Sequence, residues 1–169
     1  IRAPNWLGDA VMALAAMGAV RAAFPDAHLA VAAVRSIAPI FEQETSAGQD
    51  SLLALPDEAG EVAALAAGRF DGVVLLPNSF RSAWSARRAG IPERWGYASG
   101  MRRLLLTRAV SRPRGRVHQS VYYLELIKGL GLAAGDPWPR ISVRAATLAR
   151  ADAVLAAHDL SPGAPIVGF

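Results

Sequence analysis

The chain has 169 residues, of which 53% are hydrophobic, with no cysteine and a formal net charge of +4. This much apolar sequence excludes a disordered chain, and the lack of cysteine excludes disulfides, thiolate metal sites and a cysteine nucleophile. No run of about 18 apolar residues is free of charge, and no signal-peptide pattern is visible, so we expect neither a transmembrane helix nor a secretion signal.

Short β-type runs alternate along the chain with helical stretches. Strands are expected at 1–3 (as the end of a strand), 28–34, 51–55, 70–77 and 94–98. Helices are expected at 10–24, 36–44, 59–67, 80–89, 118–132 and 146–158. The run FDGVVLLP at 70–77 is the strongest strand, because continuous apolar runs are typical of strands buried on both faces of a parallel sheet. The alternation predicts βαβ units and an α/β fold with a mostly parallel sheet.

The stretch GDPWPR at 135–140 is rich in turn-forming residues and indicates a linker. We therefore expect a first domain over 1–134. Residues 135–169 are expected to hold the linker, a helix and, in APIVGF, the first strand of a second unit.

The basic residues are concentrated in one part of the chain. Residues 81–116 hold ten arginines and a single acid, Glu93. Such a local excess of positive charge suits an anionic partner, such as a phosphate, a carboxylate, a nucleic acid or a membrane surface. The alternative is a solvated face with scattered salt bridges.

The loop NWLGDA follows the first strand, where parallel sheets commonly bind ligands. It has one glycine where the dinucleotide fingerprint G-x-G-x-x-G needs three, so an NAD or FAD site is not expected. Gly8 allows a close approach to the backbone. Asp9 is either a helix cap or a catalytic base, and the two roles do not exclude each other.

Three long stretches carry a family resemblance: RAPNWLGDAVMALAAMGAVRAAFPDAHLAV, LLPNSFRSAWSARRAGIPERWGYA and RLLLTRAVSRPRGRVHQSVYYLELIKGLGL. Together they resemble the amino-terminal domain of the heptosyltransferases of glycosyltransferase family 9. In the opening motif Ala15 stands where the family usually has Pro. The resemblance implies one half of a GT-B enzyme, in which two Rossmann-like domains with helices on both faces of their sheets face each other across a cleft.

The resemblance also implies an activity. This half would bind the acceptor, a Kdo or heptosyl-Kdo-lipid A inner core of lipopolysaccharide, and the other half would bind ADP-heptose. The reaction would be inverting and independent of a metal or other cofactor, with Asp9 as general base. This chain alone would be inactive, since it lacks the donor half.

The positions that match the family's acceptor side define the candidate site. They are Gly8, Asn78, Ser79, Arg81, Arg94, Arg102, Arg103 and His118. Arginine forks bind the carboxylate of Kdo and the phosphates of lipid A in bidentate fashion. His118 is either an acceptor or diphosphate ligand or merely a cap of the helix that it opens. Arg108, Arg112, Arg114 and Arg116 are interpreted as a membrane-facing or solvated patch.

The expected location is the cytoplasm of a Gram-negative bacterium, in peripheral contact with the inner face of the cytoplasmic membrane. Heptosyltransferase I and later-acting core transferases of the family stay open as alternatives, because the residues do not rank the acceptors. A basic nucleic-acid-binding module is a remote alternative, since aromatic residues do not interleave with the arginines.

Overall fold

Parallel strands form the centre of the computed structural model, which describes residues 1–56 and 58–160. Two groups of strands are present: β1 (Ala30–Val34) with β3 (Ser51–Leu55), and β4 (Gly72–Leu75) with β5 (Glu93–Tyr97) and β6 (Arg108–Val110). All pairings within the two groups are parallel. The prediction of a mostly parallel α/β sheet is therefore confirmed.

Residues 1–3 connect the two groups of strands. The Arg2 N–H donates to the Val74 carbonyl at 2.9 Å, and the Ala3 N–H donates to the Ala32 carbonyl at 2.9 Å. Arg2 bridges Ala32 and Leu75 in parallel. The spatial order is therefore β3, β1, residues 1–3, β4, β5, β6. Successive strands are added on one side of residues 1–3 up to β3 and on the other side from β4 onward. The gap between residues 1–3 and β4 is therefore the switch point of the sheet, and such sheets bind ligands there, beyond the carboxyl ends of their strands.

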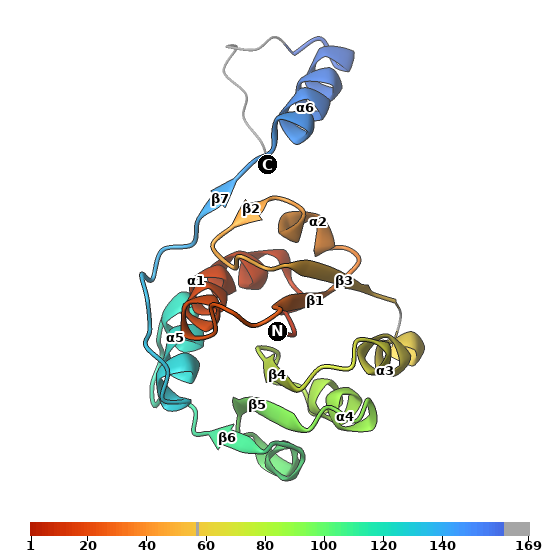
Figure 1. Ribbon diagram of the computed structural model, residues 1–169. Helices are drawn as coiled ribbons and strands as arrows, with labels where there is room; N and C mark the ends of the chain where they lie inside the picture. Colours follow the sequence, from red (N-terminus) through yellow and green to blue (C-terminus); the bar gives the residue numbers. More distant parts are fainter. Residues whose placement is uncertain (57, 161–169) are drawn as a thin grey trace.

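Helices cover both faces of the sheet (Figure 1). One face carries α1 (Leu7–Ala23) and α5 (Gln119–Gly129), and the other carries α3 (Glu58–Ala67) and α4 (Phe80–Arg88). Alternate residues of β4 divide between the two cores: Val74 packs with the α1–α5 side, whereas Val73 and Leu75 pack with the α4 side. This alternation explains why the predicted strand is apolar without a break.

Helix α1 is buried along most of its length because its alanines allow it to pack closely between the sheet and α5. It begins at Leu7, three residues before the predicted start, so Asp9 lies inside the helix. The other long helices and strands agree with the prediction to within a few residues.

Five elements differ from the sequence-based expectation. The helix expected at 36–44 is a single turn, α2 (Ala38–Phe41), and is followed by β2 (Glu44–Thr45). β2 pairs antiparallel with β7 (Ile141–Ser142), a long-range contact that local sequence does not reveal. The 3-10 helix η1 (Gly100–Leu105) and strand β6 were also not expected.

The carboxyl-terminal helix α6 (Ala145–Ala157) has no buried residue and stands apart from the sheet in Figure 1. The strand expected in APIVGF lies outside the described residues. The division of the chain into domains at 134 stays a prediction.

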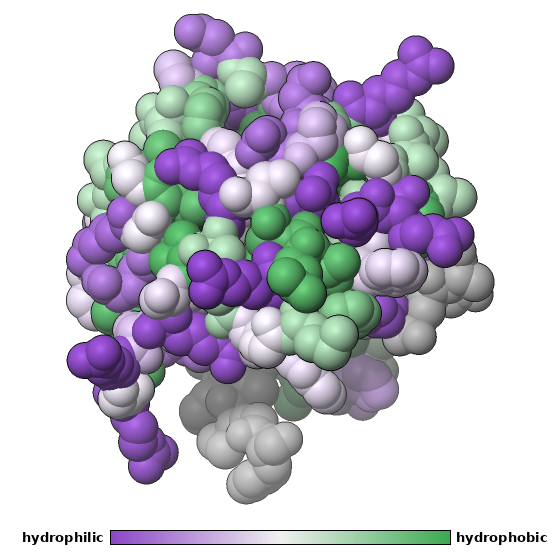
Figure 2. Space-filling model, turned by 90° about the horizontal axis from the view of Figure 1, so that it is seen from below, coloured by the Kyte–Doolittle hydropathy of each residue, from purple (hydrophilic) through white to green (hydrophobic). Residues whose placement is uncertain are grey.

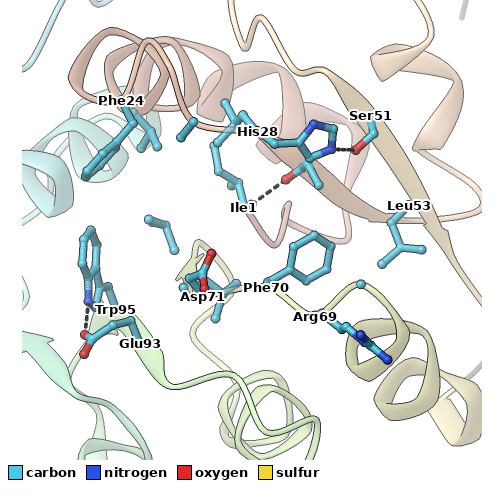
Figure 3. A pocket seen from close by; sticks show the side chains of 18 of the residues that line it. Ile1, Phe24, His28, Ser51, Leu53, Arg69, Phe70, Asp71, Glu93 and Trp95 are labelled. Carbon is cyan, nitrogen blue, oxygen red and sulfur yellow. Dashed lines mark hydrogen bonds between the residues drawn. The ribbon is translucent and has the colours of Figure 1, made fainter.

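A large apolar cavity, about 800 Å³ in volume, lies at the amino-terminal edge of the sheet. Its lining includes the first residues of four strands: Ala30, Ser51, Gly72 and Glu93. Figure 3 shows Ile1, Phe70 and Trp95 among the side chains around it. The cavity is therefore at the opposite edge from the loop that carries Asp9, and it is not part of the candidate site.

Candidate functional site

Asp9 lies in the first turn of α1, directly after the loop that leaves the central segment at the carboxyl edge of the sheet. The helix cap is Trp6, which makes no side-chain capping hydrogen bond, so the interpretation of Asp9 as the N-cap is wrong. Asp9 is half-buried, and no hydrogen bond or ion pair within residues 1–56 and 58–160 engages its carboxylate. Its lone pairs are available to a ligand, and the positive end of the helix favours its charge.

The Asp9 carboxylate lies near α5. The buried Tyr123 has its pKa raised to about 12, chiefly by burial and further by the negative charge of Asp9. The Tyr122 ring packs edge-on against the Tyr123 ring, with the two ring centroids 5.9 Å apart. Two adjacent tyrosines of α5 therefore connect Asp9 to the next part of the site.

Asn78 follows β4 at the same edge and is fixed by hydrogen bonds on both sides of its amide. Its Nδ2 donates to the Tyr122 hydroxyl at 3.0 Å, and its Oδ1 accepts from Arg102 Nη1 at 3.4 Å. The Tyr97 hydroxyl in turn donates to the Tyr122 carbonyl at 2.6 Å. The loop after β4 is thus held against α5 and η1, next to the loop that carries Asp9.

Arg102 is turned into the protein and is only 1% exposed. Its Nη1 also donates to the Tyr97 carbonyl at 3.1 Å, whereas Nε and Nη2 are buried and have no partner among the described residues. Burial, and then the charge of Arg112, lower its pKa to about 10, so the side chain stays cationic at neutral pH. Arg102 therefore supplies positive charge beneath the carboxyl edge of the sheet rather than an open fork.

A second group of charges lies beside the central segment. Arg2 and Glu61 are 1% and 3% exposed, and Arg2 Nε lies 2.9 Å from Glu61 Oε1. Arg81 Nη1 lies 3.3 Å from the other carboxylate oxygen, Oε2. Glu61 thus links the central segment (residues 1–3) to α4, and its second carboxylate oxygen orients Arg81.

The remaining residues of the expected site on this side are more exposed. Ser79 caps α4, since its hydroxyl accepts from the Ser82 N–H at 3.2 Å. Gly8 is exposed, and an added Cβ would meet nothing within 4 Å, which leaves open space over the Asp9 loop. Arg103 is an exposed residue of η1. His118 caps α5, with Nδ1 accepting from the Ser120 N–H at 3.3 Å, so its capping role is present.

The structure does not bring Arg94 together with these residues. β5 starts at Glu93, so Arg94 lies at the amino-terminal edge, opposite Asp9. Its guanidinium donates to backbone carbonyls, with Nε 2.7 Å from Leu105 O and Nη1 2.8 Å from Pro92 O. Arg94 holds the turns around its own strand.

Sequence reasoning missed five residues that shape the site: Arg2, Glu61, Tyr97, Tyr122 and Tyr123. The tyrosine pair in the α5 sequence was a visible signal, because consecutive tyrosines near a helix start place polar hydroxyls toward two neighbouring elements. No local signal linked Arg2 to Glu61, which are 59 positions apart.

No group of three potential metal ligands occurs within residues 1–56 and 58–160. In the same part of the chain, every helix is too short or too polar to cross a bilayer.

Comparison with known proteins places this chain in a family. The model of glycosyltransferase family 9 (heptosyltransferase) matches residues 62–169. The chain belongs to this family. The matched residues include Asn78, Arg102 and His118, whereas Asp9 lies ahead of them.

Two curated relatives share the family. The chain is 31% identical to lipopolysaccharide heptosyltransferase 2 of Escherichia coli K12 over 110 residues, which are 61% of the chain and 32% of that protein. It is 27% identical to the protein of the same name from Salmonella typhimurium LT2, over 98% of the chain and 51% of that protein. The chain thus spans at most about half of these family 9 relatives.

Solved structures share the fold. E. coli ADP-heptose lps heptosyltransferase II matches with a TM-score of 0.73 at 23% identity, over 97% of this chain and 51% of that one. A family 9 glycosyltransferase from Veillonella parvula matches with a TM-score of 0.75 at 16% identity, over 96% and 49%. These family 9 likenesses confirm the Rossmann-like fold class with helices on both faces.

We predict that the buried Arg2–Glu61 pair is essential for stability. Glu61→Gln leaves the charge of Arg2 buried without a carboxylate, which typically costs about 3–5 kcal/mol. Chemical denaturation of the intact protein measures the loss.

The matched control is Glu125→Gln, which removes the partner of Lys128 in an ion pair whose side chains are 37% and 56% exposed. Exposed pairs contribute about 0–1 kcal/mol, so this variant should stay close to wild type. Equal losses of unfolding free energy in the two variants would show that the buried Arg2–Glu61 pair contributes no more to stability than an exposed pair.

Proposed function

We propose that this chain is the acceptor-binding half of an enzyme that transfers heptose from ADP-heptose to the inner core of lipopolysaccharide. The proposal is supported by the family membership and by the similarity to lipopolysaccharide heptosyltransferase 2 over nearly the whole chain. The observation that carries the residue assignment is the unengaged carboxylate of Asp9 in the first turn of α1, at the switch point of the sheet. ADP-heptose would bind mainly to the half of the enzyme that follows this chain.

The proposed chemistry is a single inverting displacement that needs no metal. The hydroxyl of the acceptor sugar attacks the anomeric carbon of heptose from the side opposite to ADP. The new C–O bond forms as the bond to the ADP oxygen breaks, and the hydroxyl proton passes to the Asp9 carboxylate. The unengaged carboxylate of Asp9, in the first turn of α1 beyond the carboxyl ends of the strands, supports its assignment as this base.

The acceptor is proposed to lie over the loops at 4–9 and 77–81. Gly8 leaves space above the first loop, and Asn78 and Ser79 present polar groups in the second. The positive charges of Arg81 and the buried Arg102 attract the carboxylate of Kdo and the phosphates of lipid A. Arg103 and His118 stay candidates for direct contact from the rim.

The proposed acceptor is the heptosyl-Kdo-lipid A that suits a heptosyltransferase II, at the cytoplasmic face of the inner membrane. The name shared by both curated relatives supports this choice over heptosyltransferase I or a later core transferase. A comparison of turnover with Kdo-lipid A and heptosyl-Kdo-lipid A as acceptors distinguishes these possibilities.

We predict that Asp9→Asn in the intact enzyme lowers kcat by about 10²–10⁴, the usual contribution of a general base. The amide keeps the shape of the side chain but cannot take the proton. Since the carboxylate has no hydrogen bond or ion pair to lose among the described residues, and its charge at the helix start contributes only about 0.3–1 kcal/mol, the melting temperature should change little. Steady-state kinetics and thermal unfolding measure the two quantities.

The control is Asp26→Asn, an exposed acid in the turn after α1, which should keep full activity. Turnover of the Asp9 variant within about tenfold of wild type would remove Asp9 from the role of base.

A further inference from the structure

Two hydrogen bonds connect the buried Arg102 to the hydroxyl of Tyr122. Arg102 Nη1 donates to Asn78 Oδ1 at 3.4 Å, and Asn78 Nδ2 donates to the Tyr122 hydroxyl at 3.0 Å. Arg102 is 1% exposed, whereas Tyr122 is partly exposed. The side chains of Arg102, Asn78 and Tyr122 are here called the donor series. It leads from the interior to the carboxyl edge of the sheet, because Asn78 follows β4.

The direction of each hydrogen bond in the donor series is fixed by the chemistry of its members. A guanidinium carries only donors, so the Asn78 amide must turn its oxygen to Arg102 and its NH₂ group to Tyr122. The Tyr122 oxygen is therefore the acceptor in its bond with Asn78, and its own O–H proton must be donated elsewhere. Among the residues that the structure describes, no group accepts this proton. The donor series thus ends in an unused donor.

The donor series also carries a positive charge that no carboxylate balances. Arg102 forms no ion pair within residues 1–56 and 58–160, and its Nε and Nη2 are buried without a partner there. Buried charges in proteins are usually paired. The segment 98–118 contains no acid, and its arginines are Arg102, Arg103, Arg108, Arg112, Arg114 and Arg116. Figure 2, seen from the side of β5 and β6, shows hydrophilic side chains over much of this face.

Packing holds both ends of the donor series in place. At the buried end, Arg102 Nη1 also donates to the Tyr97 carbonyl at 3.1 Å, and a Cβ added at Gly96 would lie 3.0 Å from Nη2. At the exposed end, the Tyr122 ring lies 4.5 Å from the Tyr97 ring and 5.9 Å from the Tyr123 ring, measured between centroids. A donor that is already oriented loses little entropy when a ligand binds.

We propose that the Tyr122 hydroxyl binds an anionic oxygen of the acceptor, a carboxylate or a phosphate, and that Asn78 and Arg102 position this donor. Hydrogen bonds in series polarise one another, so the cation at the buried end strengthens the donor at the exposed end. A negative charge beside Tyr122 accepts the unused proton and balances Arg102. The inference rests on the proposed function in that the anion belongs to an acceptor lying over the loop at 77–81.

The first test is Tyr122→Phe in the intact enzyme, which removes the hydroxyl and keeps the packed ring. The KM for the acceptor should rise about 10-fold to 100-fold, the usual range for a hydrogen bond to a charged group. The kcat should stay within about twofold of wild type, because the contact is made equally in the ground state and the transition state. The KM for ADP-heptose should not change. Steady-state kinetics with each substrate varied in turn measure these quantities.

The matched control is Thr107→Val, which removes a hydroxyl at the opposite edge of the sheet. This hydroxyl donates to Glu93 Oε2 at 2.9 Å. Both KM values should stay at the wild-type level in this variant. An unchanged acceptor KM in Tyr122→Phe would overturn the proposal.

A second variant, Asn78→Asp, tests the direction of the hydrogen bonds. A carboxylate has only acceptors, so the Tyr122 O–H turns toward it and is withdrawn from the ligand. The acceptor KM should therefore rise. Combined with Tyr122→Phe, the change should raise the KM by less than the product of the two separate factors, since both act through one donor. A full product would overturn the proposed direction.

Two modified acceptors distinguish the sources of the anionic oxygen. One lacks its phosphates, and the other has its carboxylates reduced to alcohols. With the acceptor that lacks the contacted group, wild type and Tyr122→Phe should have the same KM. A difference between the two enzymes that persists with both acceptors would assign a neutral hydroxyl as the ligand and overturn the proposal.

The kinetic pattern separates this inference from the proposed function. Asp9→Asn should lower kcat with little change in the acceptor KM, which is the reverse of the pattern expected for Tyr122→Phe. Calorimetry with the acceptor alone reads the Tyr122 contact even if no heptose is transferred. Acceptor binding that Tyr122→Phe weakens, without transfer by wild type, would refute the proposed reaction alone. Transfer by wild type with unchanged affinity in Tyr122→Phe would refute the anion contact alone.

Discussion

The backbone hydrogen bonds of residues 1–3 are the constraint on which the site depends. Three residues bridge β1 on one side and β4 on the other, with Arg2 bonded through its backbone to Val74 and through its side chain to Glu61. This segment ends at the switch point and leads directly into the loop of Asp9. The loop therefore lies at the switch point, beyond the carboxyl ends of the strands, where parallel sheets commonly bind ligands.

Interacting side chains connect the Asp9 loop to η1. Tyr123 lies near Asp9, Tyr122 bonds Asn78, and Asn78 bonds Arg102. The same 3-10 turn that buries Arg102 exposes Met101 and Leu104.

The sequence was informative where the signal is local. Continuous apolar runs predicted the strand at Gly72–Leu75, and the family motif identified the loops at the carboxyl edge of the sheet. Prediction failed where a contact spans many residues: β2 pairs with β7 almost a hundred positions later, and Arg2 of the central segment pairs with Glu61 of α3. Arg94 belonged to a quoted motif, but the direction of β5 places it at the far edge. The sequence predicted both Arg102 and Arg103 as acceptor ligands, but Arg102 is buried and Arg103 is exposed. Nothing in the sequence of this arginine pair indicates which of the two turns inward.

Hydrogen–deuterium exchange of the intact enzyme with and without the acceptor tests the central claim most directly. The account predicts that the acceptor slows exchange in the loops at 4–9 and 77–81 and at the start of α5, and leaves the amino-terminal edge around 28–30 and 91–94 unchanged. Protection concentrated at the large apolar cavity beside Ile1, with none at the carboxyl edge, would contradict it.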